Sequence, residues 1–168
     1  MRIHAPIACL ALLCAAAVSP DARAAPGHDP HVAAELAALR SATAAFHRLE
    51  RAAEAGWSDE ITGCLSSPDG AMGYHYMNFG ELLDGGTVDP LRPEALVYAP
   101  DATGAPRLVA VEYVILESDL PATAPAPELF GQPFHFNPAF GVWALHAWVW
   151  KHNPAGMFAD WNPRVSCD

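Results

Sequence analysis

The chain has 168 residues, enough for one ordinary domain with a sizeable core. It carries 19 acidic residues against 9 basic ones, for a formal net charge of −10 at pH 7, and Lys151 is its only lysine. Binding to nucleic acids or to anionic membrane surfaces needs clustered positive charge, so the composition argues against both. A small molecule or a metal ion is the kind of partner that remains.

The first 24 residues are predicted to be a secretory signal peptide. The apolar stretch 5–18 has signal-peptide length and is too short to span a bilayer, and residues 22–24 form a small-x-small cleavage site. The alternative is a lipoprotein acylated at Cys14, but a leucine precedes this cysteine where a small residue is expected. We therefore expect residues 25–168 to form one periplasmic or secreted domain that does not associate with a membrane after cleavage.

Cleavage would leave two of the four cysteines, Cys64 and Cys167. In an exported chain, two cysteines favour one disulfide, which would join the C-terminal tail to the segment after the first helix. A thiolate metal site is the alternative, but it suits an oxidising compartment less well. The disulfide would close a loop of about a hundred residues, for which the chain-entropy model gives roughly 4–5 kcal/mol of stabilisation.

A long helix is predicted from Pro30 to Ala55. An acidic residue before Pro30 is typical of a helix start, and Gly56 is typical of a helix end. The apolar residues that recur at spacings of three and four would line one face of this helix: Val32, Leu36, Leu39, Ala42, Phe46, Leu49 and Ala53.

Two ionisable residues lie at or inside the apolar face of this predicted helix. Glu50 projects between Leu39 and Thr43, and His47 lies one turn earlier at the edge of the same face. Either the last turns protrude and leave Glu50 in water, or the His-x-x-Glu pair faces inward and belongs to a site.

Four strands are predicted after the helix, over residues 71–78, 94–99, 107–117 and 143–151, from alternating or β-branched sequence. The second and third are joined by a connection short enough for a hairpin. The sequence therefore predicts one α+β domain, with a long N-terminal helix packed on a mostly antiparallel sheet of four or more strands.

Three of these strands carry an ionisable side chain near the centre: His75, Glu112 and His146. A carboxylate buried alone costs several kcal/mol, so Glu112 needs a partner, and each histidine raises the same question. If the three converge, their imidazole and carboxylate groups could hold a divalent transition metal such as iron, copper or zinc. His47 is the predicted fourth ligand, and Glu50 is a further ligand or a residue that orients one.

This site is predicted where the helix meets the sheet, with apolar walls made by Phe134, Phe136, Trp148 and Trp150. An open coordination position would support metal-assisted oxidation or hydrolysis. Three alternatives stay open: a structural domain with a metal-free buried His–Glu network, a non-catalytic module that binds a small ligand in an aromatic pocket, and a haem or other cofactor site. No Cys-x-x-Cys-His motif occurs, which excludes covalent haem of the c type.

Several segments together resemble a family of exported bacterial proteins without an assigned function. The matching segments are FHRLERAAEAGW, GAMGYHYMN, DPLRPEALVYAP, LVAVEY, LFGQPF and LHAWVWKHNPAGMFADWNPRVSC. They extend over nearly all of the chain after the predicted signal peptide. The resemblance implies an exported single domain and assigns no role to any residue.

Overall fold

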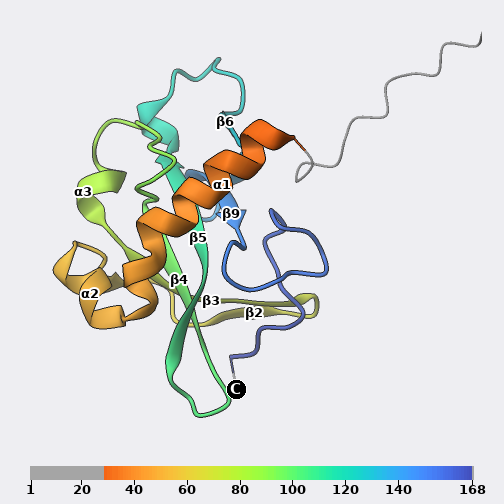
Figure 1. The fold of residues 1–168 in the computed structure, drawn as a ribbon. Coiled ribbons are helices and arrows are strands. Elements are labelled where there is room, and N and C mark those ends of the chain that lie inside the picture. Colours follow the sequence, from red (N-terminus) through yellow and green to blue (C-terminus); the bar gives the residue numbers. More distant parts are fainter. Residues whose placement is uncertain (1–28, 168) are drawn as a thin grey trace, which may run out of the picture.

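The structure is a computed structural model that describes residues 29–167 (Figure 1). The predicted signal peptide, residues 1–24, and the alternative lipidation site at Cys14 lie outside the described residues. No helix within 29–167 is both long and apolar enough to cross a membrane. The fold is α+β, with an N-terminal helix against a seven-stranded, antiparallel sheet, which confirms the predicted fold class.

The N-terminal helix starts where the sequence predicts but does not continue to residue 55. Helix α1 (Pro30–Thr43) is capped by the Asp29 side chain, which accepts a hydrogen bond from the His31 backbone N–H. A 3₁₀ turn, η1 (Ala44–His47), follows it, and after an extended residue, Arg48, the short helix α2 (Leu49–Glu54) begins.

A tertiary hydrogen bond lies at this break. The Tyr98 hydroxyl donates to the Phe46 carbonyl at 2.6 Å, the carbonyl that would accept from the backbone N–H of Glu50 in a continuous helix. Gly56, with φ of +110°, ends α2 in a conformation that favours glycine, as predicted.

The strands run in the spatial order β1-β3-β4-β5-β9-β8, with β2 paired to β3, and every pairing is antiparallel. Their bounds are β1 (Asp59–Glu60), β2 (Leu65–Ser67), β3 (Gly70–Met77), β4 (Ala95–Pro100), β5 (Pro106–Leu116), β8 (His135–Asn137) and β9 (Val142–Ala147). The remaining elements are α3 (Phe79–Leu82), η2 (Glu117–Asp119) and the two-stranded ribbon of β6 (Glu128–Leu129) and β7 (Gln132–Pro133).

The last predicted strand is shorter than its sequence pattern suggests. It ends at Ala147 because the chain turns there: the Val149 N–H donates back to the Ala147 carbonyl, and the N–H groups of Trp150 and Lys151 both donate to the Val109 carbonyl. The strict alternation of side chains therefore stops before Trp150.

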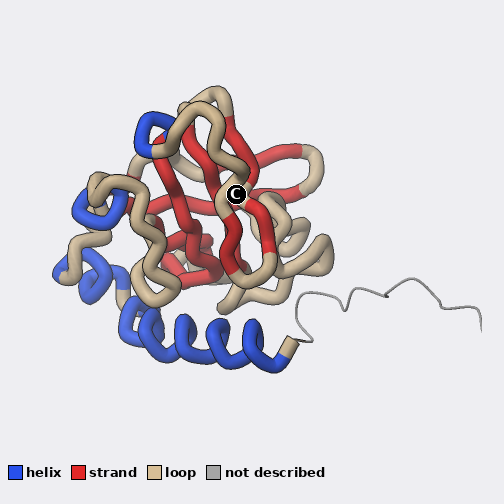
Figure 2. Tube along the Cα trace, turned by 90° about the horizontal axis from the view of Figure 1, so that it is seen from above, coloured by secondary structure: helices blue, strands red, loops and turns tan. Residues whose placement is uncertain are grey.

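The two faces of the sheet bury different sets of side chains. On β5, the bulky residues Val111, Tyr113 and Ile115 pack with Leu36 and Leu39 of α1 in the largest core cluster. Figure 2 shows α1 lying along one side of the sheet. The alternate residues of β5, among them Ala110 and Val114, pack in two smaller clusters on the opposite face.

The predicted disulfide is present, and it fixes the C-terminal segment against the opposite face. Cys64 and Cys167 are bonded across a sequence separation of 103 residues. Asn162, in the segment before Cys167, pairs with Ala71 of β3 through two backbone hydrogen bonds. At neighbouring Gly70, φ is +128° and a Cβ would lie 2.4 Å from the Asn162 carbonyl oxygen, so the close approach requires glycine.

Candidate metal centre

Three ionisable side chains from three strands meet on the face of the sheet that points away from α1. His75 comes from β3, Glu112 from β5 and His146 from β9, and the last two are directly opposite each other in the register. On β4, Ala95 pairs with Glu112 and Val97 pairs with His75. Because the side chains of Ala95 and Val97 are short, they leave space above β4 for the imidazole of His75.

The two imidazoles contact each other through their Nε2 atoms, which lie 3.1 Å apart. Their planes differ by 12° and their centroids are 5.3 Å apart, much farther than the nitrogens, so the rings meet nitrogen to nitrogen and not face to face. The Glu112 carboxylate spans both rings: Oε2 is 3.5 Å from His75 Nε2, and Oε1 is 3.6 Å from His146 Nε2. One ligand atom from each residue lies within 4.8 Å of the others.

Hydrogen bonds on the far side of each ring determine which nitrogen carries the proton. The Thr62 hydroxyl lies 2.8 Å from the Gly63 carbonyl and 3.2 Å from His75 Nδ1, and its single hydrogen can be donated to either of them. When it is donated to Gly63, the hydroxyl accepts from the Nδ1–H of His75. His146 Nδ1 lies 3.2 Å from the Asp160 backbone carbonyl, which also only accepts. The Asp160 carbonyl therefore assigns the proton of neutral His146 to Nδ1 and leaves its Nε2 unprotonated, whereas His75 Nε2 is unprotonated in the tautomer whose Nδ1–H donates to Thr62.

In that tautomer the two Nε2 lone pairs are directed at each other across 3.1 Å, and they repel unless a cation or the proton of neutral Glu112 lies beside them. An ion bound to both nitrogens at about 2.0–2.1 Å cannot lie on the line between them, because half of that line is shorter than such a bond. The ion would lie beside the line at an N–metal–N angle of about 100°, between octahedral and tetrahedral values. The nitrogen spacing therefore fits two adjacent ligands of one metal ion.

Burial makes all three side chains neutral near pH 7 in the absence of an ion. Desolvation, reinforced by His75, lowers the pKa of His146 to about 3. Desolvation also lowers the pKa of His75 to about 4, against the opposing charge of Glu60. The same cause, with Asp160 and Glu94 adding to it, raises the pKa of Glu112 to about 8. Neutral imidazole is the form that binds metals, and a bound cation would favour the ionised carboxylate.

The structure does not bring His47 and Glu50 to this group. His47, at the end of η1, is exposed and contacts the ring of Trp150 edge-on at 4.3 Å, and Glu50 is exposed at the start of α2. Trp150 packs against the core cluster beneath α1, so both residues lie across the sheet from the three strand residues. The prediction of a site between helix and sheet is therefore wrong, because apolar side chains fill that layer.

The predicted aromatic walls are also wrong, with one partial exception. Trp148 contacts the ring of His146, with centroids 5.7 Å apart. Phe134 and Trp150 belong to the core beneath α1, and Phe136 is exposed on β8. None of the four lines the cavity beside the group. The early end of β9 explains the error for Trp150, because strict alternation would have placed it on the same face as His146.

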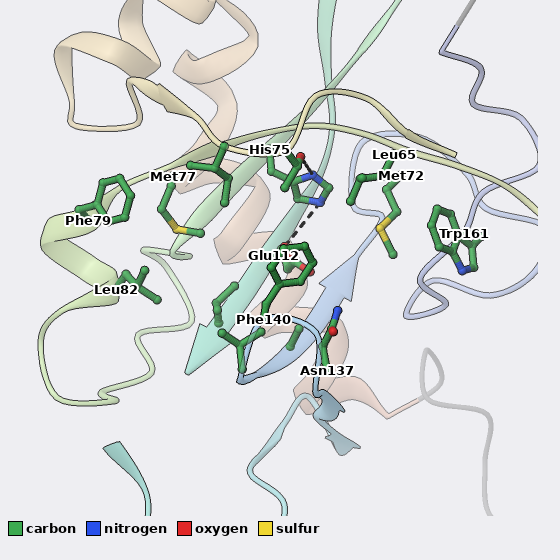
Figure 3. Close-up of a pocket in the computed structure, with 15 residues that line it drawn as sticks. Leu65, Met72, His75, Met77, Phe79, Leu82, Glu112, Asn137, Phe140 and Trp161 are labelled. Carbon is green, nitrogen blue, oxygen red and sulfur yellow. Dashed lines mark hydrogen bonds and ion pairs between the residues drawn. The ribbon is translucent and has the colours of Figure 1, made fainter. Parts of the chain in front are cut away.

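The cavity next to the group has a volume of about 510 Å³ (Figure 3). His75 and Glu112 form part of its wall, with Thr62 and Asn137 as further polar residues. Most of the wall is apolar and includes Leu65, Met72, Met77, Phe79, Phe140 and Trp161. The Glu112 side chain is 17% exposed whereas that of His146 is 1% exposed, so the carboxylate, and not His146, is accessible from the cavity.

Sequence reasoning missed the residues that orient the two imidazoles. Thr62 lies in an irregular segment after β1, and Asp160 acts through its backbone carbonyl, which leaves no signal in the residue type. The predicted disulfide was the one sequence feature that could have indicated these two segments. Cys64 lies two residues after Thr62 and Cys167 seven after Asp160, so the bond brings both orienting segments toward β3.

No protein-family model, curated protein or solved structure matches this chain in comparisons of sequence and fold.

Proposed function

We propose that this protein is an exported metal-binding protein that holds a divalent transition-metal ion through His75, Glu112 and His146. The observation that carries the proposal is the pair of buried imidazole Nε2 atoms that face each other at 3.1 Å beside a carboxyl group. The Nδ1 atom of each ring faces an oxygen, the Asp160 carbonyl at His146 and the Thr62 hydroxyl at His75, and Nδ1–H donation to such an oxygen usually fixes metal-binding histidines.

The donor set favours iron(II) or zinc, with copper as a third metal that imidazole accommodates. Two histidines and one carboxylate leave coordination positions open, as in non-haem iron enzymes and in zinc hydrolases. The exposed side of Glu112 directs those positions toward the cavity. The reaction class that we assign is metal-assisted oxidation or hydrolysis of a molecule bound there.

Export is supported by the signal-peptide pattern of residues 1–24 and by the Cys64–Cys167 disulfide, which persists in oxidising compartments. The resemblance to a family of exported bacterial proteins points the same way. We assign the mature protein to the periplasm or the extracellular medium.

Elemental analysis of protein purified from the periplasm, combined with calorimetric titration of metal-free protein with zinc, tests the metal assignment. We expect one metal ion per chain in the wild type and its loss in His146→Ala. The matched control is His47→Ala, which removes an exposed imidazole across the sheet and should leave the stoichiometry unchanged. Folded wild-type protein that contains no metal and gives no saturable zinc binding would leave only a buried polar network, and a Soret band would indicate haem instead.

A further inference from the structure

The cavity beside the three ligand residues has the size and lining of a small-molecule site. Its volume of about 510 Å³ lies within the range of about 300–1,000 Å³ typical of ligand pockets. Its polar residues are four, Thr62, His75, Glu112 and Asn137, against eleven apolar ones. Such a wall accommodates a mainly apolar molecule and offers polar contacts to only one part of it.

The charges around the cavity indicate a neutral ligand. None of the described residues that line it is a lysine or an arginine, so no side chain there pairs with an anionic group in the metal-free protein. The chain as a whole carries a net charge of −10, which further disfavours anions. A cationic ligand would compete with the metal ion for Glu112, the one carboxylate in the lining.

The rim of the cavity carries exposed apolar side chains. Among the six exposed large hydrophobic residues of the described chain, three line this cavity: Ile61 at 47% exposure, Phe79 at 44% and Phe140 at 64%. Exposed apolar side chains that gather at one opening are typical of a binding surface, because an apolar partner that covers them removes their apolar area from water. The flexible side chains of Met72 and Met77, which also line the cavity, can adjust to the shape of that partner.

We propose that this cavity binds a small, neutral, mainly apolar molecule with a single hydroxyl or carbonyl oxygen, and that this oxygen faces Glu112 and His75. The proposal that the cavity binds an apolar molecule depends on the cavity alone. The coordination of the oxygen to a metal ion rests on the proposed function, because the open positions of that ion would face the cavity.

The apolar part is tested on metal-free protein with N-phenyl-1-naphthylamine, a neutral dye that brightens in apolar surroundings. We expect saturable binding of one dye per chain. Ala144→Leu, which adds volume inside the cavity, should abolish it, and Phe140→Ala should weaken it about tenfold through the loss of buried phenyl surface. Leu83→Ala is the matched control, because Leu83 is 66% exposed but does not line the cavity. Circular dichroism melts check that each variant is folded.

The proposed position of the ligand oxygen is tested by letting 1-naphthol and naphthalene compete with the dye, with and without zinc. We expect zinc to improve the affinity for naphthol at least tenfold over that for naphthalene, and His146→Ala to remove this preference. Dye binding that is absent, or equal in wild type and folded Ala144→Leu, overturns the ligand proposal whatever the metal result. Zinc binding without a preference for naphthol overturns the oxygen assignment and leaves the metal centre intact, whereas dye binding without zinc binding refutes the proposed function alone.

Discussion

Replacing Thr62 with valine is expected to weaken metal binding without unfolding the protein. In the metal-binding tautomer of His75, the Thr62 hydroxyl, at 3.2 Å, accepts the hydrogen bond from Nδ1–H. In Thr62→Val that acceptor is lost, and the ring can take the other tautomer, in which Nε2–H donates to His146 Nε2 across the existing 3.1 Å. A metal ion must then displace a proton and break a buried hydrogen bond before it binds.

The loss of such an orienting partner typically costs a factor of about 10–100 in metal affinity, equivalent to about 1.4–2.7 kcal/mol. The stability of the metal-free protein should fall by less, roughly 1 kcal/mol, because the exposed hydrogen bond to Gly63 and the part-buried one to His75 are removed while a hydrogen bond between the imidazoles can form. Calorimetric zinc titration measures the first quantity and urea unfolding the second.

Thr103→Val is the matched control, because the Thr103 hydroxyl bonds Asp101 in an exposed turn that does not belong to the cavity. It should leave zinc affinity unchanged. Equal zinc affinity in wild type and Thr62→Val would refute the role of Thr62 in holding His75 in the Nδ1–H tautomer.

Three further predictions concern the frame around the site. Replacing both Cys64 and Cys167 with alanine should lower the free energy of unfolding in urea by up to about 4–5 kcal/mol, since the closed loop spans 103 residues. The double variant should also bind zinc more weakly. An unaltered zinc affinity in the folded variant would show that the disulfide does not support the site. Burial raises the pKa of Glu94 from 4.5 to about 8, so between these two pH values the folded state binds more protons than the unfolded state. The free energy of unfolding should therefore fall as pH rises from 4.5 to 8, by up to about 1.4 kcal/mol per pH unit. Glu94→Gln should remove that contribution, and parallel pH–stability curves for the two proteins would contradict it. Gly73→Ala should destabilise the fold by at least about 1–3 kcal/mol, because φ is +107° at this residue and a Cβ would lie 2.4 Å from the Tyr98 carbonyl oxygen. A melting temperature equal to that of wild type would count against this backbone conformation.

The fold class could be predicted because local patterns specify it. Alternation and β-branched residues located four strands to within a few residues, apart from the end of the last one, and the cap at Asp29 located the helix start. The break after the first helix could not be predicted. It coincides with the hydrogen bond from Tyr98 to Phe46, which joins residues 52 apart and has no signature in the residues around the break.

The convergence of His75, Glu112 and His146 could be predicted because a buried ionisable side chain needs a partner wherever the chain places it. The choice of His47 and Glu50 as additional ligands was wrong because periodicity shows which residues share a face, and not which face the helix covers. Packing decides that question: the helix covers the bulkier side of β5, and Glu112 alternates with those bulky residues.

Anomalous X-ray scattering from crystals grown with zinc tests the metal centre most directly. We predict one peak per chain within about 2.0–2.2 Å of Nε2 of both His75 and His146 and of a Glu112 carboxylate oxygen, on the cavity side of the line between the two nitrogens. The account would be contradicted by fully occupied zinc at other residues only, or by no bound zinc with the two imidazoles still 3.1 Å apart and joined by an Nε2–H···Nε2 hydrogen bond.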